Sequence, residues 1–443
     1  MKNYLEKIRS NWFMQVPPQR LAVLRIATGL FSLWYLLSRF DMLQKIVNNK
    51  DAFEPIGVLS WMNYPISPEI FWWITIGVIV LNVLYIIGWK FKFTGPAFAI
   101  AALVFFTYRN SWSMIYHNRN ALILHVLIIG FVASADAWSW DAWRKSKKGI
   151  SNPKTHWQYG WPIQLICAAT VGAYFLSGVA KLAGELAWEW VTGTAMRSQV
   201  AVDAIRKEML GSEAAPLFEI LFEHTWLFLG MGILTFVLEL GAPIALFKRK
   251  WGMIWAVLTW MMHWGIFFIM GISFRYQMTG LIFLAFFDVE KLWMSSKEVI
   301  SNKSIDTQIQ KTSPNSIVLF DGVCNLCNSW VKFIIKREKN ELFQFASLQS
   351  KTAQELIGDT IPQNLSSIIL IEDNIVYQKS DAVLRICRNL RTPWNWASIL
   401  ITIPRIIRNS IYDFVAKHRY RWFGKQQQCE LMLPEQRIRF LEL

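Results

Sequence analysis

Residues 317–327 of the chain read Ile-Val-Leu-Phe-Asp-Gly-Val-Cys-Asn-Leu-Cys. The first four residues form an apolar run typical of a buried strand, and Leu326–Lys339 has the apolar spacing of a helix. Cys324 and Cys327 therefore lie where a strand turns into a helix. The positive end of a helix stabilises a thiolate. This placement predicts a dithiol in which Cys324 attacks a disulfide and Cys327, one turn later, resolves the mixed disulfide.

The residues after this stretch continue the pattern of a soluble α/β domain. The expected elements are a strand at Phe343–Ala346, a helix at Lys351–Ile357, a hairpin of Ser367–Ile371 and Ile375–Gln378, and a helix at Asp381–Leu390. With the strand and helix around the cysteines, the order becomes strand, helix, strand, helix, strand, strand, helix. This order predicts a thioredoxin-like domain over residues 317–443, a context in which a Cys-x-x-Cys pair is typical of redox chemistry.

Asp321 precedes the dithiol and allows two interpretations. Its carboxylate either takes the proton of Cys327 during resolution, or caps the helix and shapes the turn. The structural role is favoured, because a carboxylate beside a thiol opposes thiolate formation. A zinc site that recruits Cys387 and Cys429 is the alternative to redox chemistry, but those two do not form a second close pair, and we expect no metal.

The segment Trp394–Phe423 mixes Trp, Ile, Phe and Tyr with Arg and Lys. Such a composition fits an amphipathic helix that lies on a membrane surface. The alternative, which we prefer from the sequence, is that this segment packs against its own domain.

The first part of the chain has the composition of a membrane protein. Hydrophobic residues make up 53% of the sequence and charged residues 17%, against about 25% charge in a typical soluble domain. The candidate spans are Leu21–Leu37, Ile70–Trp89, Phe93–Tyr108, Ala121–Ala135, Pro162–Ala180, Trp226–Phe247, Trp251–Phe274 and Tyr276–Phe287. We therefore expect a multi-span α-helical bundle over residues 1–292 with about eight transmembrane helices, or six if two short runs are re-entrant. A polar linker is expected over 293–316.

The basic residues predict the orientation of the bundle. Clusters occur near the N-terminus, at Lys90 and Lys92, at 144–148 and at 248–250. With eight spans, all of these clusters fall on one side, which the positive-inside rule makes the cytoplasm. We expect a bacterial-type inner membrane protein with both termini cytoplasmic. The net charge of +15 comes from basic residues in short loops between apolar runs and in the C-terminal part. We therefore expect a lipid bilayer as partner, and no nucleic acid.

Polar side chains inside the spans are costly and suggest functional sites. Those that stand out are Arg25, Lys181, Glu239 and His263. A desolvated Lys181 is a candidate base. The alternatives for Lys181 are an ion pair or an extended side chain that reaches the membrane interface.

Residues 317–438 resemble the DCC family of predicted thiol-disulfide oxidoreductases, named for the Asp-x-x-Cys-x-x-Cys motif. That motif is Asp321, Cys324 and Cys327 here. Further matching stretches are Phe-Ala-Ser-Leu-Gln-Ser at 345–350, Ser-Asp-Ala at 380–382, and Arg-Tyr-Arg-Trp-Phe-Gly at 419–424 followed by Cys429. Thioredoxins carry a cis-proline directly before the third strand, and Pro362 lies too early for that position. The resemblance implies dithiol chemistry without a bound cofactor.

Residues 17–290 resemble the HTTM domain, the membrane part of the vitamin K-dependent γ-glutamyl carboxylase superfamily. The run Tyr174–Leu182 matches the segment with the catalytic lysine of the carboxylase, which places Lys181 there. His117, in the stretch Trp112–Trp143, matches an active-site histidine, and His263 matches another family histidine. The resemblance implies a quinone-linked site, with His263, Arg25 and Glu239 as candidate cofactor contacts. The large lumenal domain of the carboxylase has no counterpart, so carboxylation is not predicted.

Three functions follow from these patterns. We favour a membrane-anchored thiol-disulfide oxidoreductase, a reductase because the cytoplasm keeps thiols reduced, with an unidentified disulfide substrate and electron donor. The first alternative is a quinone-linked modification enzyme that uses Lys181 as base and His117 as helper, with the dithiol domain as redox partner. The second is a transporter or passive anchor.

Overall fold

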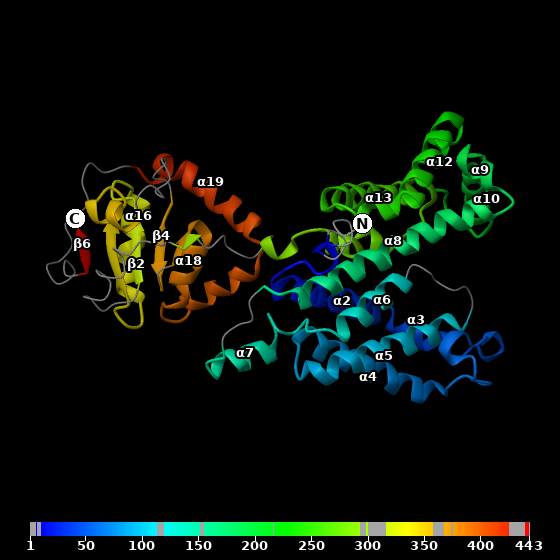
Figure 1. Cartoon of the computed structure of the whole chain (residues 1–443), viewed down its shortest axis with the longest axis horizontal. Helices are drawn as coiled ribbons and strands as arrows, with labels where there is room; N and C mark the ends of the chain where they lie inside the picture. Colours follow the sequence, from blue (N-terminus) through cyan, green and yellow to red (C-terminus); the bar gives the residue numbers. More distant parts are fainter. Residues whose placement is uncertain are drawn as a thin grey trace. The chain divides into compact units, whose positions relative to one another are not determined.

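The computed structural model of the chain describes residues 6, 10–112, 119–150, 155–215, 217–292, 298–299, 316–357, 367–373, 375–424 and 439–442. The chain divides into two compact units, Met1–Val289 and Glu290–Leu443 (Figure 1).

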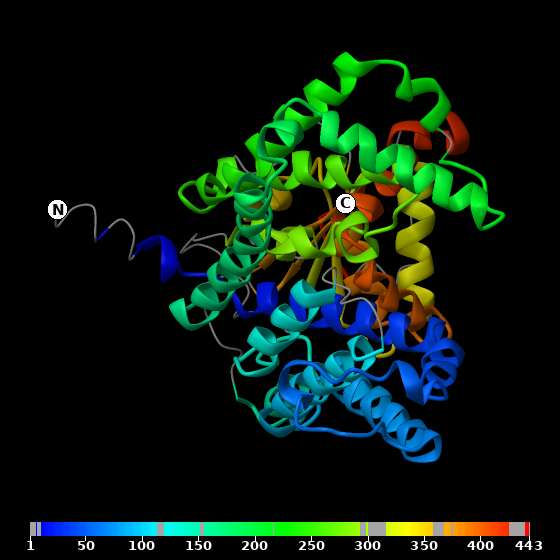
Figure 2. The same cartoon turned by 90° about the vertical axis from the view of Figure 1, so that its right-hand side faces the viewer.

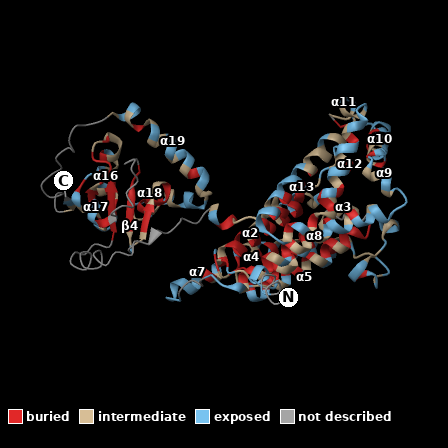
Figure 3. Ribbon diagram, turned by 45° about the horizontal axis from the view of Figure 1, so that its top comes forward, coloured by how far each residue is buried: buried red, intermediate tan, exposed pale blue. Residues whose placement is uncertain are grey.

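The first unit is helical. The helices long and apolar enough to cross a membrane are α2 (Pro18–Ser38), α4 (Pro68–Ile87), α5 (Phe91–Asn110), α8 (Gly160–Ala183, extended to Trp157 by a 3-10 turn) and α13 (Arg249–Met270). Helix α2 contacts α4, and α4 contacts α5 (Figure 2). Two shorter apolar helices, α6 (Asn120–Gly130) and α12 (Thr225–Leu240), pack against α8. Buried residues lie between the helices (Figure 3), and of the most apolar stretches of α4 and α13 only 28 and 22% is buried.

Short elements connect these helices. The short α-helices are α3 (Phe40–Ile46), α7 (Trp140–Lys147), α9 (Ala187–Val191), α10 (Thr194–Met209), α11 (Phe218–Phe222) and α14 (Arg275–Met278). The 3-10 helices are η1 (Lys50–Ala52), η2 (Gly57–Leu59), η4 (Trp157–Tyr159), η5 (Ala242–Leu246), η6 (Leu281–Phe286) and η7 (Val289–Leu292).

Local sequence signals decide where the long helices begin and end. Helix α4 begins after Ser67, whose hydroxyl accepts a hydrogen bond from the amide of Ile70, and Pro68 is its first residue. It ends at Gly88, which adopts φ 70°, a left-handed conformation that favours glycine after a helix. The observed bounds of α4 agree with the predicted span to within two residues.

The expected count of about eight spans is not confirmed, because five described helices are long enough to cross a membrane. The predicted span Tyr276–Phe287 forms only the four-residue α14 and the six-residue η6. At about 1.5 Å rise per residue in an α-helix and about 2 Å in a 3-10 helix, these cover about 18 Å of a hydrocarbon core that is about 30 Å thick. Trp226–Phe247 divides into α12 and η5, since the helix ends at Gly241 before Pro243.

The second unit is a mixed sheet with helices on both faces. Its strands are β1 (Glu298–Val299), β2 (Ser316–Phe320), β3 (Phe343–Ser347), β4 (Ile369–Glu372), β5 (Ile375–Gln378) and β6 (Phe440–Glu442). Its helices are α16 (Asn325–Arg337), α17 (Lys351–Ile357), α18 (Lys379–Arg388), the 3-10 helix η9 (Trp394–Thr402) and α19 (Arg405–Phe423). From β2 to α18 the order of elements is the predicted one.

The strands lie in the order β1-β5-β4-β2-β3-β6. Strand β2 pairs parallel with β3 and antiparallel with β4, and β5 pairs antiparallel with β4. Alternate residues of β2 enter two different cores. Val318 packs with α16 and α18 on one face, and Leu319 packs with α17 on the other.

Most of the expected linker, 293–316, falls outside the described residues. Within it, β1 pairs antiparallel with β5 and extends the sheet, and β2 begins at Ser316. The domain limits otherwise stay predictions. In the segment Trp394–Phe423, η9 contacts α18, and α19 contacts both α16 and α18. This segment therefore packs against its own domain through one of its sides.

Candidate dithiol site

The two cysteines occupy the turn between β2 and α16. Cys324 is the residue directly before α16, with φ −94° and ψ 119°, and Cys327 lies in the first turn. The amide of Cys324 donates to the carbonyl of Asp321 at 3.3 Å, and the amide of Asn328 donates to the carbonyl of Cys324 at 3.0 Å. The side chain of Asn328 also donates to the carbonyl of Gly322 at 3.0 Å. The predicted position of the dithiol at a helix N-terminus is therefore the observed one.

The two thiols differ in exposure. Both are free, Cys324 is completely buried at 0% exposure, and Cys327 is partly exposed. Burial, reinforced by the neighbouring Cys324, raises the pKa of the Cys327 thiol to about 12. Cys327 is therefore protonated at neutral pH.

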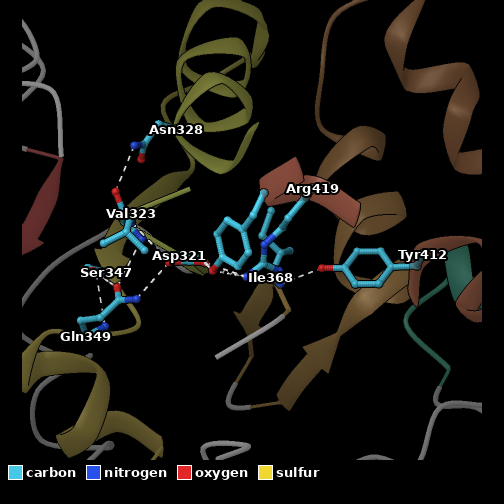
Figure 4. Close-up of polar contacts among 10 residues, drawn as sticks. Asp321, Val323, Asn328, Ser347, Gln349, Ile368, Tyr412 and Arg419 are labelled. Carbon is cyan, nitrogen blue, oxygen red and sulfur yellow. Dashed lines mark hydrogen bonds and ion pairs between the residues drawn. The ribbon is translucent and has the colours of Figure 1, made fainter. Parts of the chain in front are cut away.

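The buried Asp321 is the centre of a polar network (Figure 4). Its Oδ1 accepts from the amide of Val323 at 3.3 Å and from Nε2 of Gln349 at 3.0 Å. Its Oδ2 accepts from Nη2 of Arg419 at 2.6 Å and from the hydroxyl of Tyr420. A carboxylate offers about four acceptor positions, so these four donors fill it. The bond from Val323 fits the interpretation that Asp321 shapes the turn, whereas the cap of α16 is Cys324, whose side chain makes no capping hydrogen bond. A part for Asp321 in proton transfer stays a prediction.

Gln349 joins two loops of the site. Its Oε1 accepts from the amide of Gly322 at 3.2 Å while its Nε2 reaches Asp321. The hydroxyl of Ser347, at the end of β3, also contacts the Gln349 Oε1. Because β2 and β3 are parallel, both of their C-terminal ends lie at the same edge of the sheet. This side-chain amide therefore braces the turn that carries the cysteines.

Helix α19 contributes several side chains to the surroundings of the dithiol. Besides Arg419 and Tyr420, it contributes Tyr412, whose hydroxyl accepts from the amide of Ile368 at 2.9 Å. Burial raises the pKa of Tyr412 to about 12, with a further contribution from Cys327. Ile368 stands directly before β4, the third strand of the core, where thioredoxins have their cis-proline. The candidate considered for that role, Pro362, lies outside the described residues.

The end of α19 is also tied to the first turn of α16. The side chain of Asn325 donates to the carbonyl of Phe423 at 2.9 Å. Gly424 follows with φ 80°, and a Cβ atom there would lie 3.2 Å from Nδ2 of Asn325. The residue next to Cys324 is therefore held by a helix that begins about eighty positions later in the chain.

Sequence reasoning missed the partners of Asp321. Arg419 and Tyr420 lie in a stretch that fits the family pattern, but no role followed from the sequence. Gln349 also lies in a stretch that fits the family pattern but was given no role. Nothing in the sequence pointed to Tyr412 as a site residue. The signal that was present is the acidic residue itself, because a carboxylate predicted between a buried strand and a helix requires a cationic partner.

In the first unit, Lys181 is paired with Glu239. The ammonium of Lys181 donates to Oε1 and Oε2 of Glu239 at 2.6 and 2.7 Å, and to the hydroxyl of Ser177 at 2.9 Å. Glu239 is buried at 5% exposure. This is the ion pair considered as an alternative for Lys181.

His263, another polar residue predicted in the spans, contacts the same helix as Lys181. His263 contacts Tyr174 through Nε2 at 3.4 Å and the carbonyl of Thr259 through Nδ1 at 2.8 Å. Tyr174 lies two turns before Lys181 on α8, so His263 is near the Lys181–Glu239 pair.

Arg25 has different surroundings. It is fully buried and donates to the carbonyls of Ser134 and Trp138 at 2.7 and 2.6 Å. These bonds explain Arg25 as a residue that holds the chain after α6. His117 and Cys429 lie outside the described residues.

A buried histidine that the sequence did not single out is His125. Its Nδ1 lies 2.8 Å from the hydroxyl of Tyr276, and its Nε2 lies 3.0 Å from Oγ1 of Thr170. Both ring nitrogens therefore have partners, and His125 joins α6 to α8 and α14. Within the described ranges, no group of three or more His, Cys, Asp or Glu side chains is placed to hold a metal ion.

Comparison with known proteins extends over both units. The family model for the HTTM domain matches residues 13–290, and that for the DCC1-like thiol-disulfide oxidoreductase matches residues 318–425. The chain is 46% identical over 130 residues to Bacillus subtilis YuxK, which covers 29% of this chain and 95% of YuxK. It is 40% identical over 118 residues to the chloroplastic DCC family protein At1g52590 of Arabidopsis thaliana, covering 26% of this chain and 69% of that protein. No solved structure matches the chain.

Proposed function

Because the chain belongs to the HTTM family and carries a DCC-family domain, we propose that it is a membrane-anchored thiol-disulfide oxidoreductase that acts through Cys324 and Cys327. The observation that carries the proposal is a pair of free thiols on the cap and first turn of α16. The strand order β5-β4-β2-β3, with one parallel and two antiparallel pairs, supports a thioredoxin-like classification of this unit.

The proposed reaction exchanges two thiols for one disulfide. The thiolate of Cys324 attacks one sulfur of the substrate disulfide, forms a mixed disulfide and releases the other half as a thiolate. Cys327 gives its proton to that leaving thiolate and attacks the sulfur of Cys324, which releases the second half. The proton that Cys324 first lost to solvent returns to this second product. The substrate gains two electrons, and the site ends as a Cys324–Cys327 disulfide.

The direction and location belong to the same proposal. In a bacterial-type inner membrane with both termini in the cytoplasm, the dithiol works as a reductase, since that compartment keeps thiols reduced. An electron donor, itself a dithiol, must then reduce the Cys324–Cys327 disulfide after each turnover. The substrate is a disulfide small or mobile enough to reach a thiol that is buried in the resting structure.

Trapping experiments on the full chain in lipid nanodiscs test the roles of the two thiols. With a chromogenic aryl disulfide, Cys327→Ser should accumulate a mixed disulfide on Cys324, because the resolving thiol is missing. Cys324→Ser should release no chromophore above background. Cys387→Ser, which removes another buried thiol of the same unit, is the matched control and should react like the parent. A Cys324→Ser variant that reduces the disulfide at the parent rate contradicts the proposal.

A quinone-linked site in the first unit is the second candidate function. The observation that favours it is the polar group of Tyr174, Ser177, Lys181, Glu239 and His263 inside an apolar helical unit. The ion pair to Glu239 argues against Lys181 as a free base, so a role in orienting a ligand fits better. Quinone that copurifies with the parent and Lys181→Arg, but is lost from Lys181→Ala, would support this site. Transport or passive anchoring stays a prediction.

A further inference from the structure

One side of α19 presents apolar side chains to the surface of the second unit. The α19 stripe consists of Ile407, Ile411, Phe414, His418 and Trp422, which follow one another at three- and four-residue spacing along one helix face. Its four apolar members are exposed by 53, 62, 56 and 52%, in chain order. The ring of His418 lies 4.7 Å from that of Phe414 and 5.2 Å from that of Trp422. The stripe is therefore continuous.

The stripe is separate from the side of α19 that serves the dithiol site. That other side carries Arg408, Tyr412 and Arg419, of which Arg408 and Arg419 are buried. Arg408 donates to Asp381 at 2.6 Å, and Arg419 donates to Asp321. The packing of α19 on its own domain is thus complete without the stripe.

Basic and aromatic residues accompany the stripe. Lys417 and Arg421 are exposed on the neighbouring side of α19. The acidic residue of that side, Asp413, is paired with Lys379 at 2.8 Å. Just before α19, the 3-10 helix η9 exposes Trp396 and Ile399 by 65% each. The exposed surface of the segment is therefore apolar, aromatic and positively charged.

We infer that the α19 stripe docks on the anionic surface of a lipid bilayer, with its apolar side chains at the boundary between headgroups and acyl chains. Apolar and aromatic side chains beside Lys and Arg are the composition that binds helices to anionic membrane interfaces. The same chain carries helices long enough to span a membrane, so a bilayer is present at high effective concentration. This inference does not depend on the proposed redox function.

Docking has a consequence for the dithiol. Since α19 holds Asp321 through Arg419 and holds the first turn of α16 through the Asn325–Phe423 bond, a docked α19 keeps the dithiol close to the membrane surface. Disulfides of membrane-bound molecules would then be favoured over those of freely diffusing ones.

Photo-crosslinking of the full chain tests the docking. A benzophenone amino acid replaces Ile411, or in the matched control Glu355, in nanodiscs that contain phosphatidylglycerol. Glu355 is exposed on α17, which covers the opposite face of the sheet from α16 and α18. Mass spectrometry should find lipid adducts at position 411 roughly fivefold above those at 355, as expected for an interfacial helix. Changing Lys417 and Arg421 to Gln should lower the adduct yield roughly threefold in these anionic discs.

Other results would overturn the inference. Adducts from position 411 to residues 1–289 would show that the first unit of the protein covers the stripe. Adducts to another copy of the chain would make the stripe a subunit interface. Equal lipid yields at 411 and 355 would show that the stripe faces water.

Discussion

At the scale of single residues, one buried carboxylate connects the segments that surround the two cysteines. Asp321 is almost completely buried and accepts hydrogen bonds from donors on three different segments of the chain. A buried carboxylate is tolerated only when it is paired and hydrogen-bonded. We therefore regard Asp321 as the residue that joins the dithiol turn to α19.

Removing Arg419 from its ion pair with Asp321 should destabilise the second unit. Arg419→Leu leaves the Asp321 carboxylate buried without its charge partner, and we expect the free energy of unfolding to fall by about 3 kcal/mol. The double variant Asp321→Asn with Arg419→Leu should recover much of this loss, because no buried charge remains. Urea-dependent proteolysis of the full chain measures the free energy of unfolding of the single and the double variant.

The matched control for this prediction is a more exposed ion pair in the same unit. Arg385 pairs with Glu372 at 2.9 Å, with 28 and 17% of the two side chains exposed. Arg385→Leu should lower the free energy of unfolding by less than about 1 kcal/mol. If Arg419→Leu has no larger effect than Arg385→Leu, Asp321 is not the joining residue that we describe.

The raised pKa of Cys327 predicts a pH dependence. A thiol with a pKa of about 12 is protonated at pH 8, and its thiolate fraction rises about tenfold with each pH unit below that pKa. The alkylation rate of Cys327 by iodoacetamide should therefore still be rising at pH 10. An unburied thiol, with a pKa of about 8.5, would level off near pH 9 to 10. Fragment-ion mass spectrometry of alkylated peptides from the parent chain measures the rate at Cys327, and a plateau near pH 9 would contradict its raised pKa.

At the scale of elements, α16 and α19 are joined by a hydrogen bond next to the buried Cys324. The side chain of Cys324 is fully buried, and the neighbouring Asn325 anchors the end of α19. A substrate disulfide reaches Cys324 only if the surrounding elements move. Each of the two helices follows from its own local sequence, whereas the Asn325–Phe423 bond between them joins residues that are 98 positions apart.

Loosening that contact should expose the nucleophile. Asn325→Ala removes the hydrogen bond to Phe423, and we expect alkylation of Cys324 by iodoacetamide at pH 7 to accelerate several-fold, about 3 to 10 times, since one bond to backbone is worth about 1 kcal/mol. Asn395→Ala, in the 3-10 helix η9, is a control for the loss of an asparagine side chain in the same unit. An unchanged rate for Asn325→Ala would show that α19 does not limit access.

At the scale of the whole molecule, the number of spans decides on which side the dithiol lies. Within the described residues, five long and two shorter apolar helices are present. An odd number of crossings places the second unit on the opposite side of the membrane from the N-terminus, and an even number places both on the same side. The charge pattern predicts the same side, which requires an even number of crossings. That number is eight if Tyr276–Phe287 completes a span, and six if two short runs are re-entrant.

Cysteine labelling in intact cells resolves this point. Cys324 cannot report it, because its burial protects it on either side. Glu355→Cys places a thiol at an exposed position of the second unit. Met209→Cys places one at an exposed position between the predicted spans Pro162–Ala180 and Trp226–Phe247, which lies on the outer side of an eight-span bundle with a cytoplasmic N-terminus. An impermeant maleimide should label Met209→Cys in intact cells but Glu355→Cys only after permeabilisation, with the parent chain as background. Labelling of Glu355→Cys in intact cells would remove the basis for a cytoplasmic reductase.

The sequence by itself determined the elements of this protein and the position of its dithiol. Strand and helix bounds from β2 to α18 lie within about two residues of prediction, since they follow from apolar periodicity and local turn signals. The long spans were equally readable, because the bilayer demands continuous apolar runs. The dithiol followed from the same logic, since a strand-to-helix turn and two cysteines are contiguous in the chain.

Only the tertiary structure decided which polar groups meet. The distant partners of Asp321 come from the loop after β3 and from α19, and the carboxylate partner of Lys181 comes from α12. These contacts join distant positions, and many pairings satisfy the same composition, so local pattern cannot choose among them. The tertiary structure also decided which side of the amphipathic α19 packs against its own domain and which side remains exposed.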